Sequence, residues 1–304
     1  MKKISGLLIL LLGLSFAVMA QNDLQLSHQI YNRILFNPAA TGQSGCYNIT
    51  LLAREQWTGI KKAPETQILN INKYITPAKL GLGLSVISDK VGYENILNVK
   101  AAIAYHAWLS KRTVLSFGVG GGIISTTVEG SKLTYQEPGD PNATISNITH
   151  VYPDFDFGAE FNSGGLNLGV SSTHVVTSFK KSDLMKMPRH IYAYGKYAIK
   201  VTKGFEIIPA VSYSNINRVH LFDCNATFSF SDRVWAGASY RIEDSFVLMA
   251  GVKIINQLRI GYSYDFKTGP IKSAITKGTH EAMIQMKFGC PSAKPNQISP
   301  RFFN

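Results

Sequence analysis

Residues 97–108, with the sequence LNVKAAIAYHAW, decide the fold class of this chain. Every second residue from Leu97 to Ala107 is apolar, and the positions between them include Asn98 and Lys100. Successive side chains of a β-strand point to opposite faces, so this period of two predicts a strand with one apolar and one more polar face. The same alternation recurs at 69–72, 222–230 and 280–288.

The composition indicates that these strands lie in a membrane. Charged residues make up only 16% of the chain, against about 25% in ordinary globular proteins. After residue 20, the longest apolar runs, such as Leu80–Ile87, have the length of a strand and not of a membrane helix. A closed β-barrel is the membrane structure that pairs all its backbone groups without helices, with a polar face toward the lumen and an apolar face toward lipid. A soluble β-sandwich would show the same alternation.

The connections between strands favour the barrel. One set consists of tight turns such as Thr76-Pro77-Ala78, and the other contains the longest segments, 126–153, 173–189 and 266–279. Short turns on one side and long loops on the other are typical of outer-membrane barrels. We therefore predict an all-β, antiparallel outer-membrane barrel of about 14 strands, an even number that would place both chain ends in the periplasm. The strands are expected near 46–56, 65–75, 79–88, 95–109, 112–125, 154–162, 165–172, 190–200, 204–214, 219–230, 233–241, 245–254, 257–265 and 279–288.

The first twenty residues have the pattern of a secretory signal peptide. Lys2 and Lys3 precede an apolar run, and Ala20 ends a cleavage site of small or apolar residues. We expect four parts: a signal peptide at 1–20, a periplasmic lead-in segment at 21–45, the barrel at 46–290 and a C-terminal tail at 291–304. The lead-in is expected to be ordered, either against the periplasmic mouth of the barrel or inside the lumen.

The chain is strongly basic, with a formal net charge of +12. Its basic residues are scattered, and no basic block alternates with aromatic residues, which argues against a nucleic-acid partner. For an exported protein, this charge favours anionic lipid, sugar or an acidic protein partner.

No residue set predicts catalysis, a cofactor or a metal site. Gly118–Gly122 lacks the spacing of a phosphate loop and is better explained by close packing of a strand. Ser171-Ser172 and His174 have no acidic residue that would complete a hydrolase triad. Asp154 and Asp156 share a strand face, where a solvated pair in the lumen is favoured over a cation site. We expect a protein without enzymatic activity.

The cysteines suggest one disulfide. Export favours oxidation, and the first and last strands of a closed barrel are neighbours. Cys46 lies at the start of the first strand and Cys290 at the end of the last, so we expect these two to be bonded and Cys224 to remain free on a lipid-facing side. Simple alternation places Cys46 and Cys290 on opposite faces, so the bond requires a local bend.

Several short motifs follow one another along the chain. NPAATG at 37–42 comes before the first expected strand. REQWTG at 54–59 overlaps the end of that strand, and APET at 63–66 follows. Further motifs are LGLG at 80–83, DKVG at 89–92, PDF at 153–155, GVSSTH at 169–174, WAGASYR at 235–241 and GTHE at 278–281. In this order and spacing they resemble the PorP/SprF family of type IX secretion system membrane proteins, over almost the whole expected mature length. The tail after Gly289 and the lead-in are the least similar parts.

The resemblance implies an accessory barrel beside the type IX translocon. Such barrels are associated with particular secreted cargo proteins through the C-terminal signal domain of the cargo, with retention of cargo at the cell surface, and in some cases, through periplasmic partners, with the cell wall and gliding. Arg54, Gln56, Trp57 and Asp89 are the candidate partner-binding residues, and packing in the lumen or bracing of loops is the alternative role for them.

A diffusion or solute-uptake channel is the alternative function. A barrel of about 14 strands is intermediate between small filled barrels and open porins, so an open lumen is physically possible. A blocked lumen would favour the secretion role, and an open, charge-lined pore would favour transport.

Overall fold

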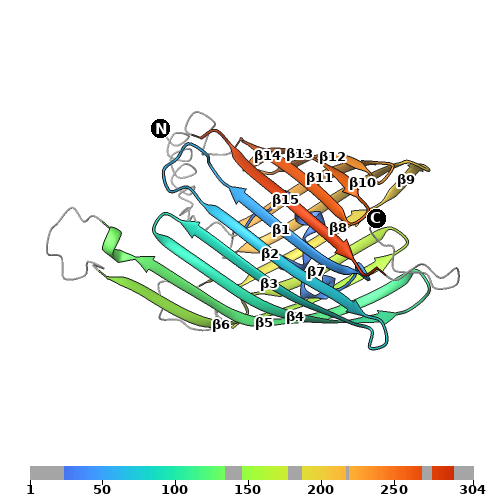
Figure 1. Ribbon diagram of the computed structural model, residues 1–304, viewed down its shortest axis with the longest axis horizontal. Coiled ribbons are helices and arrows are strands. Elements are labelled where there is room, and N and C mark those ends of the chain that lie inside the picture. The colour runs from blue at the N-terminus through green and yellow to red at the C-terminus, as the bar shows by residue number, and fades with distance from the viewer. Residues whose placement is uncertain (1–23, 134–145, 177–186, 217–218, 269–275, 291–304) are drawn as a thin grey trace, which may run out of the picture.

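The computed structural model describes residues 24–133, 146–176, 187–216, 219–268 and 276–290, and they form a closed antiparallel β-barrel (Figure 1). The first strand, β1 (Tyr47–Glu55), pairs with both β2 (Glu65–Ile75) and the last strand, β15 (Thr279–Phe288), which closes the sheet. The predicted all-β, antiparallel barrel is confirmed.

The wall contains fourteen strands in sequence order. β8 (His190–Tyr197) and β9 (Ile199–Thr202) are two parts of one strand, because both pair with β10 (Phe205–Ile216). The other strands are β3 (Leu80–Val91), β4 (Glu94–Trp108), β5 (Thr113–Glu129), β6 (Asn147–Ser163), β7 (Leu166–Thr173), β11 (Val219–Phe230), β12 (Val234–Arg241), β13 (Ser245–Ile255) and β14 (Leu258–Lys267). We call the end where β1 begins and β15 finishes the short-turn end, and the opposite end the long-loop end.

One predicted loop is shorter than expected. The segment 126–153 was expected to be a loop, but β5 continues to Glu129 and β6 begins at Asn147, and the two pair along this whole extension. Pro153 lies within β6, where a proline without an N–H disrupts a central strand. It is tolerated because β6 pairs with β7 only from Phe157 onward, so among the described strands Pro153 lies on an edge. Residues 134–145 of this connection and 177–186 of the 173–189 connection are outside the described residues.

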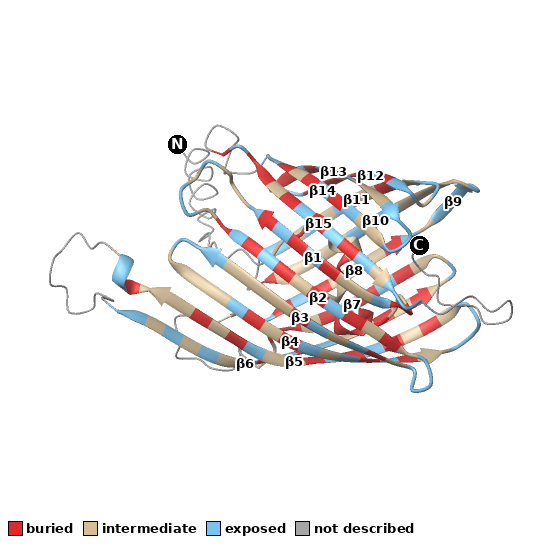
Figure 2. Cartoon of the chain, viewed as in Figure 1, coloured by how far each residue is buried: buried red, intermediate tan, exposed pale blue. Residues whose placement is uncertain are grey.

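The wall buries polar side chains on its inner face and exposes apolar side chains on its outer face, which is the reverse of a soluble protein. Lumen-facing Thr50 and Asn70 are fully buried, whereas outward-facing Leu51 and Ile284 are each 43% exposed. Figure 2 shows this alternation of buried and exposed residues along β1, β2 and β15. An apolar outer belt around a polar interior is the pattern of a barrel that lies in lipid. Among the described residues, no helix is long and apolar enough to cross a membrane.

Residues 24–45 lie inside the barrel, and we call them the plug. They contain three short 3-10 helices, η1 (Gln29–Tyr31), η2 (Arg33–Leu35) and η3 (Pro38–Ala40), drawn in dark blue in Figure 1. Their apolar side chains form a core with lumen-facing residues of the wall: Leu26, Leu35 and Phe36 pack against Leu52, Ile68 and Tyr192.

The plug runs the length of the lumen. Leu24 borders a cavity together with Ile216 and Arg241, the last residues of β10 and β12 at the long-loop end. Cys46 precedes β1 at the short-turn end. The wall strands therefore begin and finish at one end, as the even strand number predicts, but the start of the plug lies toward the other end. Of the two places expected for the lead-in, residues 24–45 occupy the lumen.

Cys46 and Cys290 form a disulfide bond, with their Cα atoms 4.3 Å apart. Tyr47 is the register partner of Phe288, so a regular continuation would place Gly289 opposite Cys46. Gly289 has a φ of +59°, a left-handed conformation that glycine adopts without strain, and this supplies the local bend that brings Cys290 to Cys46. Cys224 is free and exposed on the outer face.

Candidate functional site in the barrel lumen

Asn37 anchors the plug to the wall of β6, β7 and β8. Its Nδ2 donates hydrogen bonds to the Ala159 carbonyl at 3.0 Å and to the Tyr194 hydroxyl at 3.1 Å. Its Oδ1 accepts from the Ala39 N–H at 2.9 Å and so caps η3, in which Pro38 takes the first position. Proline is suited to that position because the missing N–H has no partner there in any case. The NPAATG motif therefore begins a helix and fixes it to the barrel.

Glycines on the wall create the space for this contact. A Cβ added at Gly81, Gly118 or Gly158 would lie 2.0, 2.3 and 2.0 Å from plug atoms of residues 37–41. Such separations are shorter than any real carbon contact, so a side chain at these positions would displace the plug. The glycines on β3, β5 and β6 thus form a flat surface for η3, and Gly118 belongs to the run that superficially resembles a phosphate loop.

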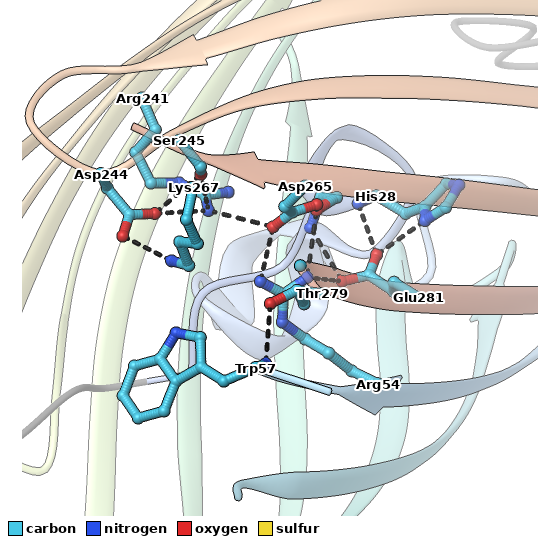
Figure 3. Close-up of polar contacts among 12 residues, drawn as sticks. His28, Arg54, Trp57, Arg241, Asp244, Ser245, Asp265, Lys267, Thr279 and Glu281 are labelled. Carbon is cyan, nitrogen blue, oxygen red and sulfur yellow. Dashed lines mark hydrogen bonds and ion pairs between the residues drawn. The ribbon is translucent and has the colours of Figure 1, made fainter. Parts of the chain in front are cut away.

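A buried ion-pair cluster holds the start of the plug (Figure 3). Arg54 on β1 donates to Asp265 on β14 at 2.7 Å and to Glu281 on β15 at 2.9 Å. Glu281 also accepts from the backbone N–H groups of Ser27 and His28, at 2.9 and 2.7 Å, and contacts Nδ1 of His28 at 2.6 Å. We call these five residues the Arg54 cluster. Because buried charges require paired partners, the cluster fixes both the plug and the seam where the barrel closes.

The cluster continues to the long-loop end through Arg241. Its guanidinium lies 3.5 Å from Asp265, 3.3 Å from Asp223 and 3.2 Å from Asp244, and Lys267 lies 2.6 Å from Asp244 (Figure 3). Asp244 belongs to the turn between β12 and β13. Burial alone would raise the pKa of Asp244, but the charges of Arg241 and Lys267 outweigh it and hold the pKa at about 2.

A second buried cluster corrects one prediction. Asp154 and Asp156 were expected to be a solvated pair, but both are buried in the lumen. Lys100 lies 3.0 Å from Asp154 and 2.8 Å from Asp156, and His174 lies 3.0 Å from Asp154. The two carboxylates and His174 are close enough together to hold a metal ion. The ammonium group of Lys100 already supplies the positive charge, so the arrangement is an ion-pair cluster of the protein itself.

The candidate partner-binding residues are all near the long-loop end, but Arg54 is not accessible. It is only 2% exposed. Gln56 and Trp57 are half-buried just after β1, and the Trp57 N–H donates to Thr279 Oγ1 at 3.2 Å. Asp89 on β3 accepts a hydrogen bond from the Thr66 hydroxyl. Arg54 therefore has the lumen-packing role, and the other three are partly exposed near the rim.

Sequence reasoning did not identify the partners of the plug. Ser171, considered for a hydrolase, donates its hydroxyl to the Phe36 carbonyl at 2.5 Å. Glu281 was noted only as the last residue of the GTHE motif, and no partner was predicted for it or for Asp265, although each lies at a lumen-facing position of its strand. The sequence did contain one signal for these partners, namely a charged residue at a lumen-facing position of a strand next to the first strand. Glu281 is such a residue, and it is the register partner of Arg54.

Comparisons with known proteins agree with this architecture. A family model described as "Type IX secretion system membrane protein PorP/SprF" matches residues 18–286. No curated protein matches the chain.

Solved structures with a similar fold include an outer-membrane protein, a transporter and a channel. Omp33 of Acinetobacter baumannii has a TM-score of 0.50 at 10% identity, over 82% of this chain and 100% of that chain. The toluene transporter TbuX of Ralstonia pickettii has a TM-score of 0.52 at 11% identity, over 84% and 93%. The monoaromatic hydrocarbon channel CymD has a TM-score of 0.53 at 10% identity, over 84% and 92%. At such identities the likeness concerns the fold alone.

Proposed function

The chain belongs to the PorP/SprF family of type IX secretion system membrane proteins, and we propose that this outer-membrane barrel docks particular secreted cargo at the cell surface beside the translocon. In this proposal the barrel has no enzymatic activity. Its partners are the C-terminal signal domain of the cargo, the translocon and periplasmic proteins linked to the cell wall and, in gliding cells, to motility.

The occupied lumen is the observation that supports this proposal. A transport barrel uses its lumen-facing side chains to line a path for solute. Here Arg54, Glu281 and Asp265 are bonded to one another or to the plug. Gly118 packs against the plug backbone and Gly158 against the side chain of Asn37. Because these lumen-facing residues hold the plug and do not line a path for solute, a function at the rim is favoured.

The rim at the long-loop end offers the contact surface. We place the short-turn end in the periplasm, as is usual for outer-membrane barrels. The extension of β5 and β6 then faces the exterior, and its Val151 is 59% exposed. Half-buried Trp57 lies at the same end, and an aromatic side chain is suited to anchor a protein partner. Without Lys2 and Lys3 of the expected signal peptide, the net charge of +12 becomes +10, and this charge favours encounter with an acidic cargo domain.

A solute-uptake channel remains the second candidate. Cavities border the plug on the side of β10 and β11, where Ser212 and Asp223 line them. Two of the similar structures are a transporter and a channel. A path along this side of the plug is the structural basis of this candidate.

A deletion strain separates the two functions. We expect loss of a small set of proteins from the cell surface, measured by mass spectrometry after surface proteolysis, with normal uptake of small solutes. Trp57→Ala and a deletion within 126–153 should reproduce this loss with the barrel inserted normally, whereas Lys111→Ala in a turn at the opposite end should not. If the deletion strain keeps all its surface proteins and loses solute uptake, the transport function is correct and the docking function is wrong.

A further inference from the structure

Five exposed basic residues lie in the turns at the short-turn end, and we call them the cationic collar. They are Lys79 in the β2–β3 turn, Lys111 and Arg112 in the β4–β5 turn, Lys203 in the β9–β10 turn and Arg233 in the β11–β12 turn. None of the five forms an ion pair with another described residue. Four of the six turns that join strands at this end therefore present cations to their surroundings.

The carboxylates near these turns already have cations of their own. Within two residues of the turns at this end, the described chain has two carboxylates, Glu206 and Asp232. Glu206 lies 3.6 Å from Lys200, and Asp232 contacts both Lys253 and, at 3.3 Å, Arg259. The described part of the chain therefore leaves the charge of the collar available to a partner.

The long-loop end is different, because exposed groups of both signs lie side by side there. Lys132 lies 2.8 Å from Glu129, and Lys90 is the register partner of Glu65 across β2 and β3. The lysines of that end thus have carboxylates of the chain beside them, which the five residues of the collar do not.

Backbone hydrogen bonds fix the turns of the collar in place. Each bond joins a cationic turn to the next strand or turn along the rim: the Lys79 carbonyl accepts from the His106 N–H at 2.9 Å, the Arg112 carbonyl from the Gly164 N–H at 3.3 Å and the Arg233 carbonyl from the Lys253 N–H at 2.6 Å. The β4–β5 and β11–β12 turns are six of the fourteen wall strands apart. The collar therefore presents cations on nearly opposite sides of the barrel.

Exposed apolar residues accompany the cations. Leu109, Val201 and Val234 lie within two residues of Lys111, Lys203 and Arg233, and they are 62%, 52% and 49% exposed. In a barrel that lies in lipid, such side chains belong to the outer apolar belt, so the collar lies where this belt meets the lipid head groups. Lysine and arginine are suited to this position, because their stems pack along apolar surface while the charged ends reach the polar layer.

We propose that the cationic collar binds the head groups of anionic phospholipids in the membrane leaflet at the short-turn end. Phosphate oxygens accept charge-assisted hydrogen bonds from ammonium and guanidinium groups. A lysine or arginine at an anionic membrane surface strengthens binding about fivefold. The apolar residues beside the cations and the spread of the collar around the rim favour lipid over an acidic protein, because lipid surrounds a barrel on all sides. This inference depends on the barrel in its membrane and not on the docking of cargo.

Native mass spectrometry of the full-length barrel, released from nanodiscs that contain equal parts of phosphatidylglycerol and phosphatidylcholine, tests the collar. At low salt, we expect the lipid retained by the wild type to be enriched in phosphatidylglycerol by about threefold or more. Lys79→Gln/Lys111→Gln/Arg112→Gln should lose about half of this enrichment, and the further changes Lys203→Gln and Arg233→Gln should abolish it. The matched control Lys61→Gln/Lys62→Gln/Lys90→Gln removes the same charge from exposed positions at the long-loop end and should retain lipid like the wild type.

Folding of each variant is verified by its heat-dependent shift on a gel, and the triple collar variant decides the matter if the variant with five changes does not fold. High salt should lower the enrichment in the wild type, because salt screens exposed charges. Equal retention of the two lipids by the wild type would overturn the proposal and leave the collar open to an acidic protein. An equal loss of enrichment in the long-loop control would also overturn it, since binding would then follow overall charge.

Discussion

Arg54 and Glu281 are register partners across the β1–β15 seam, and their side chains form a buried ion pair of 2.9 Å inside the barrel. The pair joins the first strand to the last at the point where the sheet closes. Because the Glu281 carboxylate also accepts hydrogen bonds from the backbone N–H groups of Ser27 and His28, it connects the seam to the plug.

Arg54→Ala should destabilise the barrel by about 3–5 kcal/mol, because it removes a buried cation that Glu281 and Asp265 share. Asp265 would then keep only the longer contact of 3.5 Å with Arg241, and Glu281 only its contacts with the plug. The midpoint of the heat-dependent gel shift measures the loss, and protease should then cut the plug in the folded barrel. Glu55→Ala, which changes the exposed neighbour, is the control and should behave like the wild type. An unchanged midpoint in Arg54→Ala would show that the cluster does not hold the seam.

Gly118→Ala should loosen the plug while leaving the wall intact. The new Cβ would lie 2.3 Å from Ala39, and forced overpacking of this kind costs about 1–3 kcal/mol. Gly121→Ala is a matched control on the same strand, because its Cβ would make only an ordinary contact with Phe155 at 3.6 Å. Limited proteolysis of both variants should cut residues 24–45 in the first and spare them in the second; equal protection would contradict the close packing of η3.

The disulfide predicts the number of reactive thiols. The unreduced, denatured protein should take up one alkyl group, at Cys224, and three after reduction, as measured by mass spectrometry. Cys224→Ser should take up none before reduction. Three alkylated thiols in the unreduced wild type would show that Cys46 and Cys290 are not bonded.

Asp244 should make stability depend on pH in the acid range. Its pKa is about 2 in the folded protein and about 4 in an unfolded chain. A lowered pKa stabilises the fold above the unfolded value, and this stabilisation disappears as the pH falls from about 4 to about 2. With allowance for its partial exposure, Asp244→Asn should therefore be less stable than the wild type by about 1–2 kcal/mol at pH 7. The difference should vanish near pH 2, and a difference that is constant over this range would refute the ion-pair explanation.

The wall could be predicted from the sequence because period two and turn residues are local signals. The expected strand at 65–75 agrees with β2 and the one at 279–288 with β15. The extension of β6 was missed because Pro153 normally ends a strand, and only its place at an edge makes it acceptable. The contacts of the lumen were beyond local signals: nothing in the neighbourhood of Arg54 indicates that Asp265 and His28 will meet it. The motif NPAATG was noticed through family resemblance, whereas its role as an anchor follows from the glycines opposite it.

The passage of the plug through the lumen changes the count of crossings. Fourteen wall strands alone would return the chain to the side from which it started. Residues 24–45 add one more passage before β1, so the described part of the chain runs along the barrel an odd number of times. Among the described residues, Leu24 consequently lies toward the long-loop end of the barrel, whereas Cys290 is bonded to Cys46 at the short-turn end.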